Sequence, residues 1–408
     1  MERSTNRILT THVGSLVKTP EIIDQMRAQA MGEPFDEDIL AKHLRTGVAQ
    51  VVRKQAEVGV DLPSDGEYGK SSWMGYVWDR ISGLEPTDQL PAQDGVNWFT
   101  LRAQQFPGFH RAYDRFETTV WMPDLPSGKK PQNANVLRFF VVTGPVRYKG
   151  HVAIRRDIEN FKAELAQNKF VEAFLPAVAP CSCSFPGMNR YYKSEEEYLF
   201  ATADALHEEY KAIVDAGLLL QVDDAILPMM YVVGAPGQDL QKYLKWAAMC
   251  MDALNHALRG IPEDRVRYHI CWGSQNAPHT WDIPLKEIVH LVLKVKAQAY
   301  CIEAANPQHE HEWQVWEKVK LPAGKILVPG VVTHCTNVVE HPELVAWRLG
   351  TFARLVGREN VIGGTDCGFS QGWNWARVHE EVQWAKLASL AEGAGIATRQ
   401  LWGKSAAE

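Results

Sequence analysis

The second half of the chain contains two cysteines, a histidine and a glutamate at positions that suit metal binding. His269 and Cys271 are separated by one residue, Glu303 follows, and Cys367 lies in a Thr-Asp-Cys-Gly segment near the end. Thiolate, imidazole and carboxylate donors together favour zinc. Each of the four stands at the downstream end of a short apolar run or just beyond it. We therefore predict a zinc site formed by His269, Cys271, Glu303 and Cys367.

This set of ligands also indicates a type of reaction. Two thiolates and a carboxylate would leave a zinc site with a formal charge near minus one, so the ion would activate water poorly. Such a site instead favours a substrate thiol, whose pKa the metal lowers and whose sulfur stays nucleophilic. Glu303 is the hardest of the four ligands and the one that a substrate sulfur could displace. A purely structural zinc site is the alternative, but such sites favour closely spaced cysteine pairs.

Short apolar runs alternate with longer amphipathic segments along the whole chain, which predicts an α/β protein with a parallel sheet. The number of runs favours a single domain over 1–408 that closes into a (β/α)8 TIM barrel. One run must lie outside the barrel, because nine are candidates. An open doubly wound sheet is the competitor, but it usually carries a glycine-rich phosphate turn after its first strand. The candidate strands are 7–12, 58–63, 136–143, 170–179, 218–223, 266–271, 297–303, 325–332 and 360–365.

Helical signals fill the segments between these runs. Residues 36–59 place apolar side chains on one face, Ser194 begins a capping-box pattern, and Pro342 has the place of a first-turn proline. Residues 83–134 break the rhythm with proline, glycine and aromatic residues. We predict that this segment is an insertion after the second strand, either a lid or an interface arm.

Further polar residues follow other strands, where a barrel places its active-site mouth. Ser15 follows the first run, Glu67 the second and Asp223 the fifth. The carboxylates could anchor a substrate ammonium or cap a loop. His334, beside Cys335, could relay protons or bond a loop carbonyl. His309 and His311 lie in a polar loop, where we expect them to be solvated.

Composition limits the classes of partner. The chain of 408 residues is 46% hydrophobic, has a net charge of -6, and shows no long charged block. Nucleic acid and membranes are therefore poor candidates, and we expect small-molecule substrates, with a homo-oligomer as an option. Its start lacks the apolar core of a signal peptide, so we expect a cytoplasmic protein. Seven thinly spread cysteines favour free thiols over disulfides.

Taken together, these residues resemble the catalytic half of cobalamin-independent methionine synthase and its stand-alone relatives. The resemblance covers most of the chain apart from the insertion, and the family's zinc ligands fall on His269, Cys271, Glu303 and Cys367. It implies a zinc-dependent methyltransferase that moves a methyl group from a methyl-folate-type donor to homocysteine or a similar thiol, as in methionine biosynthesis.

The resemblance also implies substrate residues. The family's Gly-Ser element, which contacts the amino-acid substrate, falls on Gly14 and Ser15. Its Gly-Glu element falls on Glu67, and its strand-end aspartate on Asp223, the expected partner of a substrate amino group. The family's Asp-x-His relay is replaced here by 333–335, where His334 is the candidate proton shuttle.

Two related barrels are alternatives. The core also resembles the epoxyalkane–coenzyme M transferases, in which zinc activates a sulfonate thiol. A sulfonate would need a cation near the first loops, and Lys18, Lys70 and Arg190 are the candidates. A decarboxylase of the uroporphyrinogen type shares the fold but needs no metal.

Overall fold

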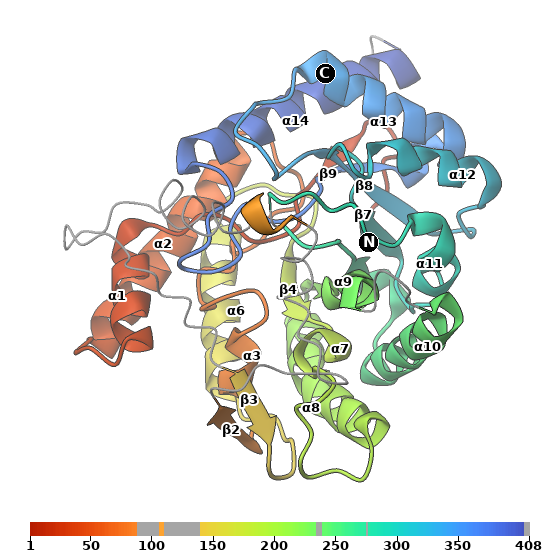
Figure 1. Cartoon of the computed structure of the whole chain (residues 1–408). Helices are drawn as coiled ribbons and strands as arrows, with labels where there is room; N and C mark the ends of the chain where they lie inside the picture. The colour runs from red at the N-terminus through yellow and green to blue at the C-terminus, as the bar shows by residue number, and fades with distance from the viewer. Residues whose placement is uncertain (88–105, 110–138, 234–238, 275, 404–408) are drawn as a thin grey trace.

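A computed structural model describes residues 1–87, 106–109, 139–233, 239–274 and 276–403 (Figure 1). Its main feature is a curled sheet of seven strands, and all neighbouring strands in it are parallel. In spatial order the strands are β1 (Leu9–Thr10), β9 (Ile362–Thr365), β8 (Ile326–Val332), β7 (Ala299–Ile302), β6 (Val266–His269), β5 (Leu219–Asp223) and β4 (Phe174–Val178).

The predicted second strand, 58–63, does not form a regular strand, so the sheet has seven strands in place of the expected eight. Leu62 forms an isolated parallel bridge with Thr11, and the Phe174 backbone N–H donates to the Pro63 carbonyl at 3.0 Å. The segment thus reaches both edge strands, but Pro63 lacks a backbone donor and a turn begins at Gly66. The barrel prediction is confirmed in part, as a curled parallel sheet of seven strands within the described residues.

Of the nine candidate strands, 136–143 lies outside this sheet, as expected for one of the nine. β3 (Phe139–Val142) pairs antiparallel with β2 (Leu84–Thr87) and forms a separate two-stranded ribbon. The ribbon joins the two ends of the predicted insertion, of which residues 88–105 and 110–134 lie outside the described part of the chain. A lid or interface role for the insertion therefore stays a prediction.

Helices lie around the outside of the strands (Figure 1). Asp36 caps α2 by accepting hydrogen bonds from the N–H groups of Asp38 and Ile39, and Ser194 caps α8. Pro342 is in the first turn of α13, so all three helix signals are confirmed. The α-helices of the described residues are α1 (Pro20–Ala30), α2 (Glu37–Glu57), α3 (Tyr76–Arg80), α6 (His151–Leu165), α7 (Pro180–Cys183), α8 (Glu195–Asp215), α9 (Ile226–Val233), α10 (Leu240–Ala257), α11 (Leu285–Val292), α12 (Val315–Lys318), α13 (Pro342–Val356) and α14 (Glu380–Trp402).

The interior of the curled sheet is packed with side chains, as in barrel folds. Leu9, Leu62, Phe174 and Ile362 belong to one buried cluster that draws on nearly every strand. β6 contributes Arg267, whose guanidinium lies 3.9 Å from the centre of the Phe174 ring. A filled interior leaves the loops at the carboxyl ends of the strands as the place for a site. Within the described residues, every helix is too short or too polar to cross a membrane.

Candidate metal centre

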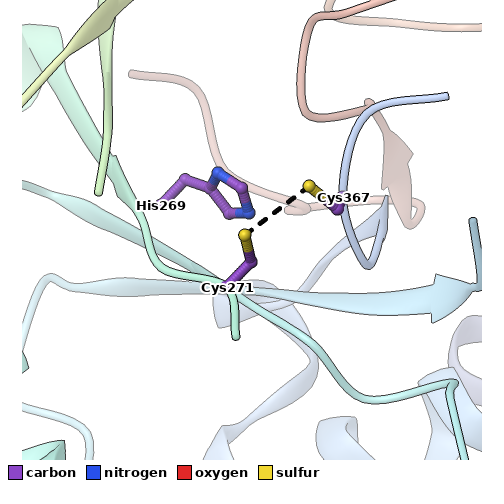
Figure 2. A group of neighbouring side chains, drawn as sticks. All are labelled: His269, Cys271 and Cys367. Carbon is purple, nitrogen blue, oxygen red and sulfur yellow. Dashed lines mark hydrogen bonds between the residues drawn. The ribbon is translucent and has the colours of Figure 1, made fainter. Parts of the chain in front are cut away.

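His269, Cys271 and Cys367 converge at the carboxyl ends of two strands. His269 is the last residue of β6, Cys271 is two residues further on, and Cys367 is two residues past the end of β9. One ligand atom from each lies within 4.8 Å of the other two, and the two Sγ atoms are 3.6 Å apart. Figure 2 shows the three side chains pointing toward one another. All three are buried.

The spacing and chemistry of these three donors fit a zinc ion. Two thiolates on one tetrahedral zinc, each at about 2.3 Å, would stand about 3.8 Å apart, close to the observed separation. Asp223 Oδ1 lies 2.9 Å from His269 Nδ1, which leaves Nε2 as the nitrogen available to a metal. The adjacent Cys367 thiol and burial hold the pKa of Cys271 well above its usual range. A cation would reverse that preference and bind the thiolates.

Glu303 lies nearby but is not one of the three converging residues. Its Oε1 accepts a hydrogen bond from the Trp272 backbone N–H at 3.0 Å, and its Oε2 accepts one from Asn306 Nδ2 at 2.7 Å. Burial raises the pKa of the Glu303 carboxyl well above its usual range. The prediction that Glu303 is the fourth ligand therefore stays a prediction, with the carboxylate held by other partners in this structure.

A pocket of about 780 Å³, including its open mouth, borders the three donors. Of the predicted substrate residues, Ser15, Glu67 and Asp223 line it, whereas Gly14, Glu303 and His334 do not. Much of the remaining wall is apolar or aromatic, which restricts water around a bound ligand. The lining residues that the sequence argument did not single out are Val13, Trp73, Met74, Ala225, Ile226, Met229, Gly273, Ser274, Gly368, Gln371, Trp375 and Arg377.

Two donors of the predicted Gly14–Ser15 grip bond to groups within the protein. Gly14 has a φ of +122°, and a Cβ there would lie 2.5 Å from a Pro176 side-chain carbon, so only glycine fits. The Gly14 backbone N–H donates to His12 Nδ1 at 3.1 Å, and the Ser15 hydroxyl donates to the Ser370 carbonyl. These two hydrogen bonds shape the loop, and the predicted contact of the Gly14–Ser15 backbone with the substrate stays a prediction.

Glu67 occupies a strained backbone position next to the pocket. Its φ of +58° is unusual for a residue with a side chain. Lys70 Nζ donates to Glu67 Oε1 at 2.9 Å and to the Pro176 carbonyl at 2.6 Å, and both side chains of the pair are buried. The lysine thus neutralises the carboxylate inside the protein.

His334 is fully buried and does not line the pocket. Burial lowers its pKa to about 3, so the imidazole is neutral at neutral pH. Its Nε2 lies 3.5 Å from Cys335 Sγ, and its Nδ1 is buried without a hydrogen-bond partner in the described structure. The proton-shuttle role of His334 stays a prediction.

The three cations suggested as partners of a substrate sulfonate lie outside the pocket lining. Lys18 and Lys70 are buried, and Arg190 is exposed and bonds the Gly187 and Asn189 carbonyls. None of the three lines the pocket, whereas Arg377 does. Sequence reasoning missed Arg377, although its position shortly after Cys367 in the same loop was a usable signal.

His309 was expected to be solvated, and that expectation is wrong. Its side chain is buried, it lies 2.9 Å from Glu312 Oε2 through Nδ1 and 3.3 Å from Asp282 Oδ2 through Nε2, and it stacks on Trp272. Hydrogen bonds fold the polar loop inward.

Comparison of the sequence with known proteins identifies the family of this chain. The sequence model of the family described as "Cobalamin-independent synthase, Catalytic domain" matches residues 141–388. The chain is 24% identical to the protein YxjH of Bacillus subtilis over 393 residues, which covers 93% of this chain and 92% of YxjH. It is 24% identical to the methionine synthase of Sulfolobus acidocaldarius over 288 residues, covering 70% of this chain and 68% of the relative.

The fold has solved counterparts as well. A B12-independent methionine synthase from Shewanella sp. W3-18-1, in complex with selenomethionine, superposes with a TM-score of 0.68 at 18% identity. The alignment covers 98% of this chain and 100% of that structure. A putative vitamin-B12 independent methionine synthase from Listeria monocytogenes gives a TM-score of 0.64 at 19% identity, with the same coverage. The family match spans more than half of the sequence, so this chain belongs to the cobalamin-independent synthase family, through its catalytic domain.

Proposed function

We propose that the protein is a zinc-dependent thiol alkyltransferase that moves a methyl group from a methyl-folate-type donor to homocysteine or a similar thiol. The observation that carries the proposal is the convergence of His269, Cys271 and Cys367 on a pocket that Asp223 and Glu67 also line. Family membership, relatives named methionine synthase, and a fold relative in complex with selenomethionine support it. Methylation of homocysteine gives methionine, and selenomethionine is the selenium analogue of that product.

Each part of the pocket has a task in this proposal. His269, Cys271 and Cys367 would hold zinc, and the ion would supply a lowered pKa for the substrate thiol, so that the sulfur is nucleophilic at neutral pH. Asp223 orients His269 through Nδ1 and offers a buried carboxylate to a substrate ammonium. Glu67 adds a second carboxylate, fixed by Lys70. Apolar walls such as Met74 keep water away from the reacting methyl group.

The epoxide–coenzyme M type of thiol transferase is the first alternative, since both reactions alkylate a thiol. The Asp223 carboxylate on the pocket wall favours a thiol that carries an ammonium group, which coenzyme M lacks. A metal-independent decarboxylase of the uroporphyrinogen type is the second alternative. Two thiols and an imidazole within 4.8 Å of one another argue against it, because such a cluster serves no purpose in that reaction.

Metal analysis combined with zinc-edge spectroscopy tests the proposal. We expect one zinc per chain and an added sulfur in its coordination on titration with homocysteine but not with coenzyme M. A response to coenzyme M alone would favour the first alternative. Absence of tightly bound zinc in the purified protein would favour the second. Cytoplasmic location and oligomeric state stay predictions from the sequence.

A further inference from the structure

Both oxygens of the Glu303 carboxylate are held by donors outside the group of three converging residues. Oε1 accepts the hydrogen bond from the Trp272 backbone N–H at 3.0 Å, and Oε2 accepts the one from Asn306 Nδ2 at 2.7 Å. Glu303 is 3% exposed and Asn306 is 4% exposed, so water has little access to either side chain. A buried carboxylate depends strongly on such donors, because losing one leaves charge without hydration. Glu303 thus has a binding place of its own inside the protein.

Asn306 joins this carboxylate to the turn that carries Cys367. The same Nδ2 lies 3.2 Å from Oδ2 of Asp366, the residue that directly precedes Cys367, so one amide group faces two carboxylates. Asp366 Oδ1 accepts hydrogen bonds from the backbone N–H groups of the two residues that follow Glu303, at 2.7 and 2.9 Å. Asp366 therefore fixes the loop after β7 against the loop after β9.

The Asn306 amide and the Asp366 carboxylate are both fixed in orientation. Asn306 Oδ1 accepts hydrogen bonds from the backbone N–H groups of Gln308 and His309, both at 3.1 Å. Asp366 is fully buried, and a Cβ at Gly330 would lie 2.4 Å from its Oδ1, so a side chain there would displace it. Because Oδ1 of Asn306 is occupied in this way, its Nδ2 faces the two carboxylates.

These contacts compete with a metal for the Glu303 carboxylate. Three protein donors leave one position on a tetrahedral zinc ion, and either Glu303 or a substrate thiol can take it. Whatever stabilises the carboxylate away from the ion therefore favours the thiol. The hydrogen bond from Asn306 makes such a contribution, and it is made to a charged group in a buried place, where hydrogen bonds are strong.

We propose that Asn306 is a positioning residue that holds Glu303 away from the metal position and thereby favours binding of the substrate thiol. This inference rests on the proposed function, and in it Asn306 acts through Glu303 without touching the thiol. Asn306 does not line the pocket, in agreement with an indirect role. Loss of the amide should weaken thiol binding but should not weaken zinc binding, because the freed carboxylate stays available to the ion.

Two titrations that compare Asn306→Ala with wild type provide the test. Chelator competition measures the affinity for Zn²⁺, and calorimetry on the zinc protein measures the affinity for homocysteine. We expect the variant to bind homocysteine about 10- to 100-fold more weakly, the usual contribution of a hydrogen bond to a charged group, and to bind Zn²⁺ at least as tightly as wild type. A general defect of the loop would weaken both, so the two affinities separate a positioning role from a structural one.

A second background tests whether the effect depends on Glu303. In Glu303→Gln the amide competes poorly for zinc, so adding Asn306→Ala should change the homocysteine affinity by less than about twofold. Asn306→Ser keeps an acceptor for the two loop N–H groups but lacks the amide donor, and it should show the same split if the alanine variant does not fold. Asn255→Ala is the matched control, because Asn255 bonds the Lys294 carbonyl at an exposed site near the end of α10.

Three results would each overturn the inference. Equal weakening of zinc and homocysteine binding would show that Asn306 only holds the loop together. Unchanged homocysteine affinity would show that the amide has no influence on the thiol. A full loss in the Glu303→Gln background would show that the effect does not depend on Glu303. All three require a wild-type protein that binds homocysteine. If the wild-type zinc protein does not bind it, the proposed function itself fails, and the inference fails with it.

Discussion

Asp223 and His269 are register partners on the neighbouring parallel strands β5 and β6, and Asp223 Oδ1 lies 2.9 Å from His269 Nδ1. The carboxylate thereby selects which imidazole nitrogen is available to a metal. Gln221 Nε2 also donates to Asp223 Oδ1, at 2.8 Å. Both of these hydrogen bonds involve the same oxygen. One aspartate can therefore orient the metal-binding histidine with Oδ1 and meet a substrate ammonium with Oδ2.

Asp223→Asn should weaken zinc binding without removing any of the three converging donors. An amide orients the ring less strongly and does not raise the basicity of the imidazole, so we expect about a 10- to 100-fold loss of zinc affinity. Chelator competition measures it. Asp224→Asn is the matched control, because Asp224 bonds Ser182 and Tyr268 and does not line the pocket. Equal loss of zinc affinity in both variants would contradict the assigned role of Asp223.

Substitutions can test whether zinc binding depends on Glu303 as much as on the three converging residues. Since Trp272 and Asn306 hold its carboxylate in this structure, Glu303→Gln should still purify with zinc. Cys367→Ala should lose most of the metal, because it removes one of the three converging donors. Metal analysis after gel filtration compares the two variants. Complete loss of zinc from Glu303→Gln would show that this carboxylate is a ligand as essential as the cysteine.

Local sequence patterns were sufficient to predict much of the site. The two-residue period of a strand already placed His269 and Cys271 on the same face, and the Thr-Asp-Cys-Gly turn placed Cys367 at a strand end. The register of β5 against β6, which brings Asp223 to His269, depends on packing between distant segments. The inward position of Arg377 depends on the hairpin after Cys367. The pairing of Asp223 with His269 has no local signal in the sequence, whereas the place of Arg377 shortly after Cys367 was a weak one.

For the fold as well, features set by local sequence were predicted correctly, and features set by contacts between distant segments were not. The apolar runs correctly predicted the strands of the parallel sheet, because a strand buried on both faces is apolar throughout. The irregular segment around Leu62 was predicted to be a regular strand, since its apolar residues resemble the others. His309 was misjudged because Asp282 lies in a separate loop and Glu312 faces the histidine only through the 3-10 helix Glu310–Gln314, which the sequence alone did not reveal.

Lys70→Met should destabilise the protein strongly. Lys70 and Glu67 form a buried ion pair, and removing one partner leaves an uncompensated charge, which costs about 3–5 kcal/mol. The double variant Glu67→Gln with Lys70→Met should recover part of that loss, because no charge is then left unpaired. Denaturant unfolding measures the free energies. Lys42→Met, at an exposed position on α2, is the control. Additive losses in the double variant would rule out direct coupling.

His309 makes a pH-dependent contribution to stability. Burial opposes its protonation, but the hydrogen bonds to Asp282 and Glu312 prevail and raise its pKa to about 10. The folded pKa lies above the unfolded value of about 6.5, so the stabilisation is complete below about pH 6.5 and is lost as the pH rises toward 10. The free energy of unfolding of wild type should therefore exceed that of His309→Gln most in mildly acidic solution. His311→Gln, at an exposed neighbouring position, should show no such trend. Denaturant titrations across this pH range provide the measurement, and a gap between wild type and His309→Gln that widens with pH would refute the assigned charge state.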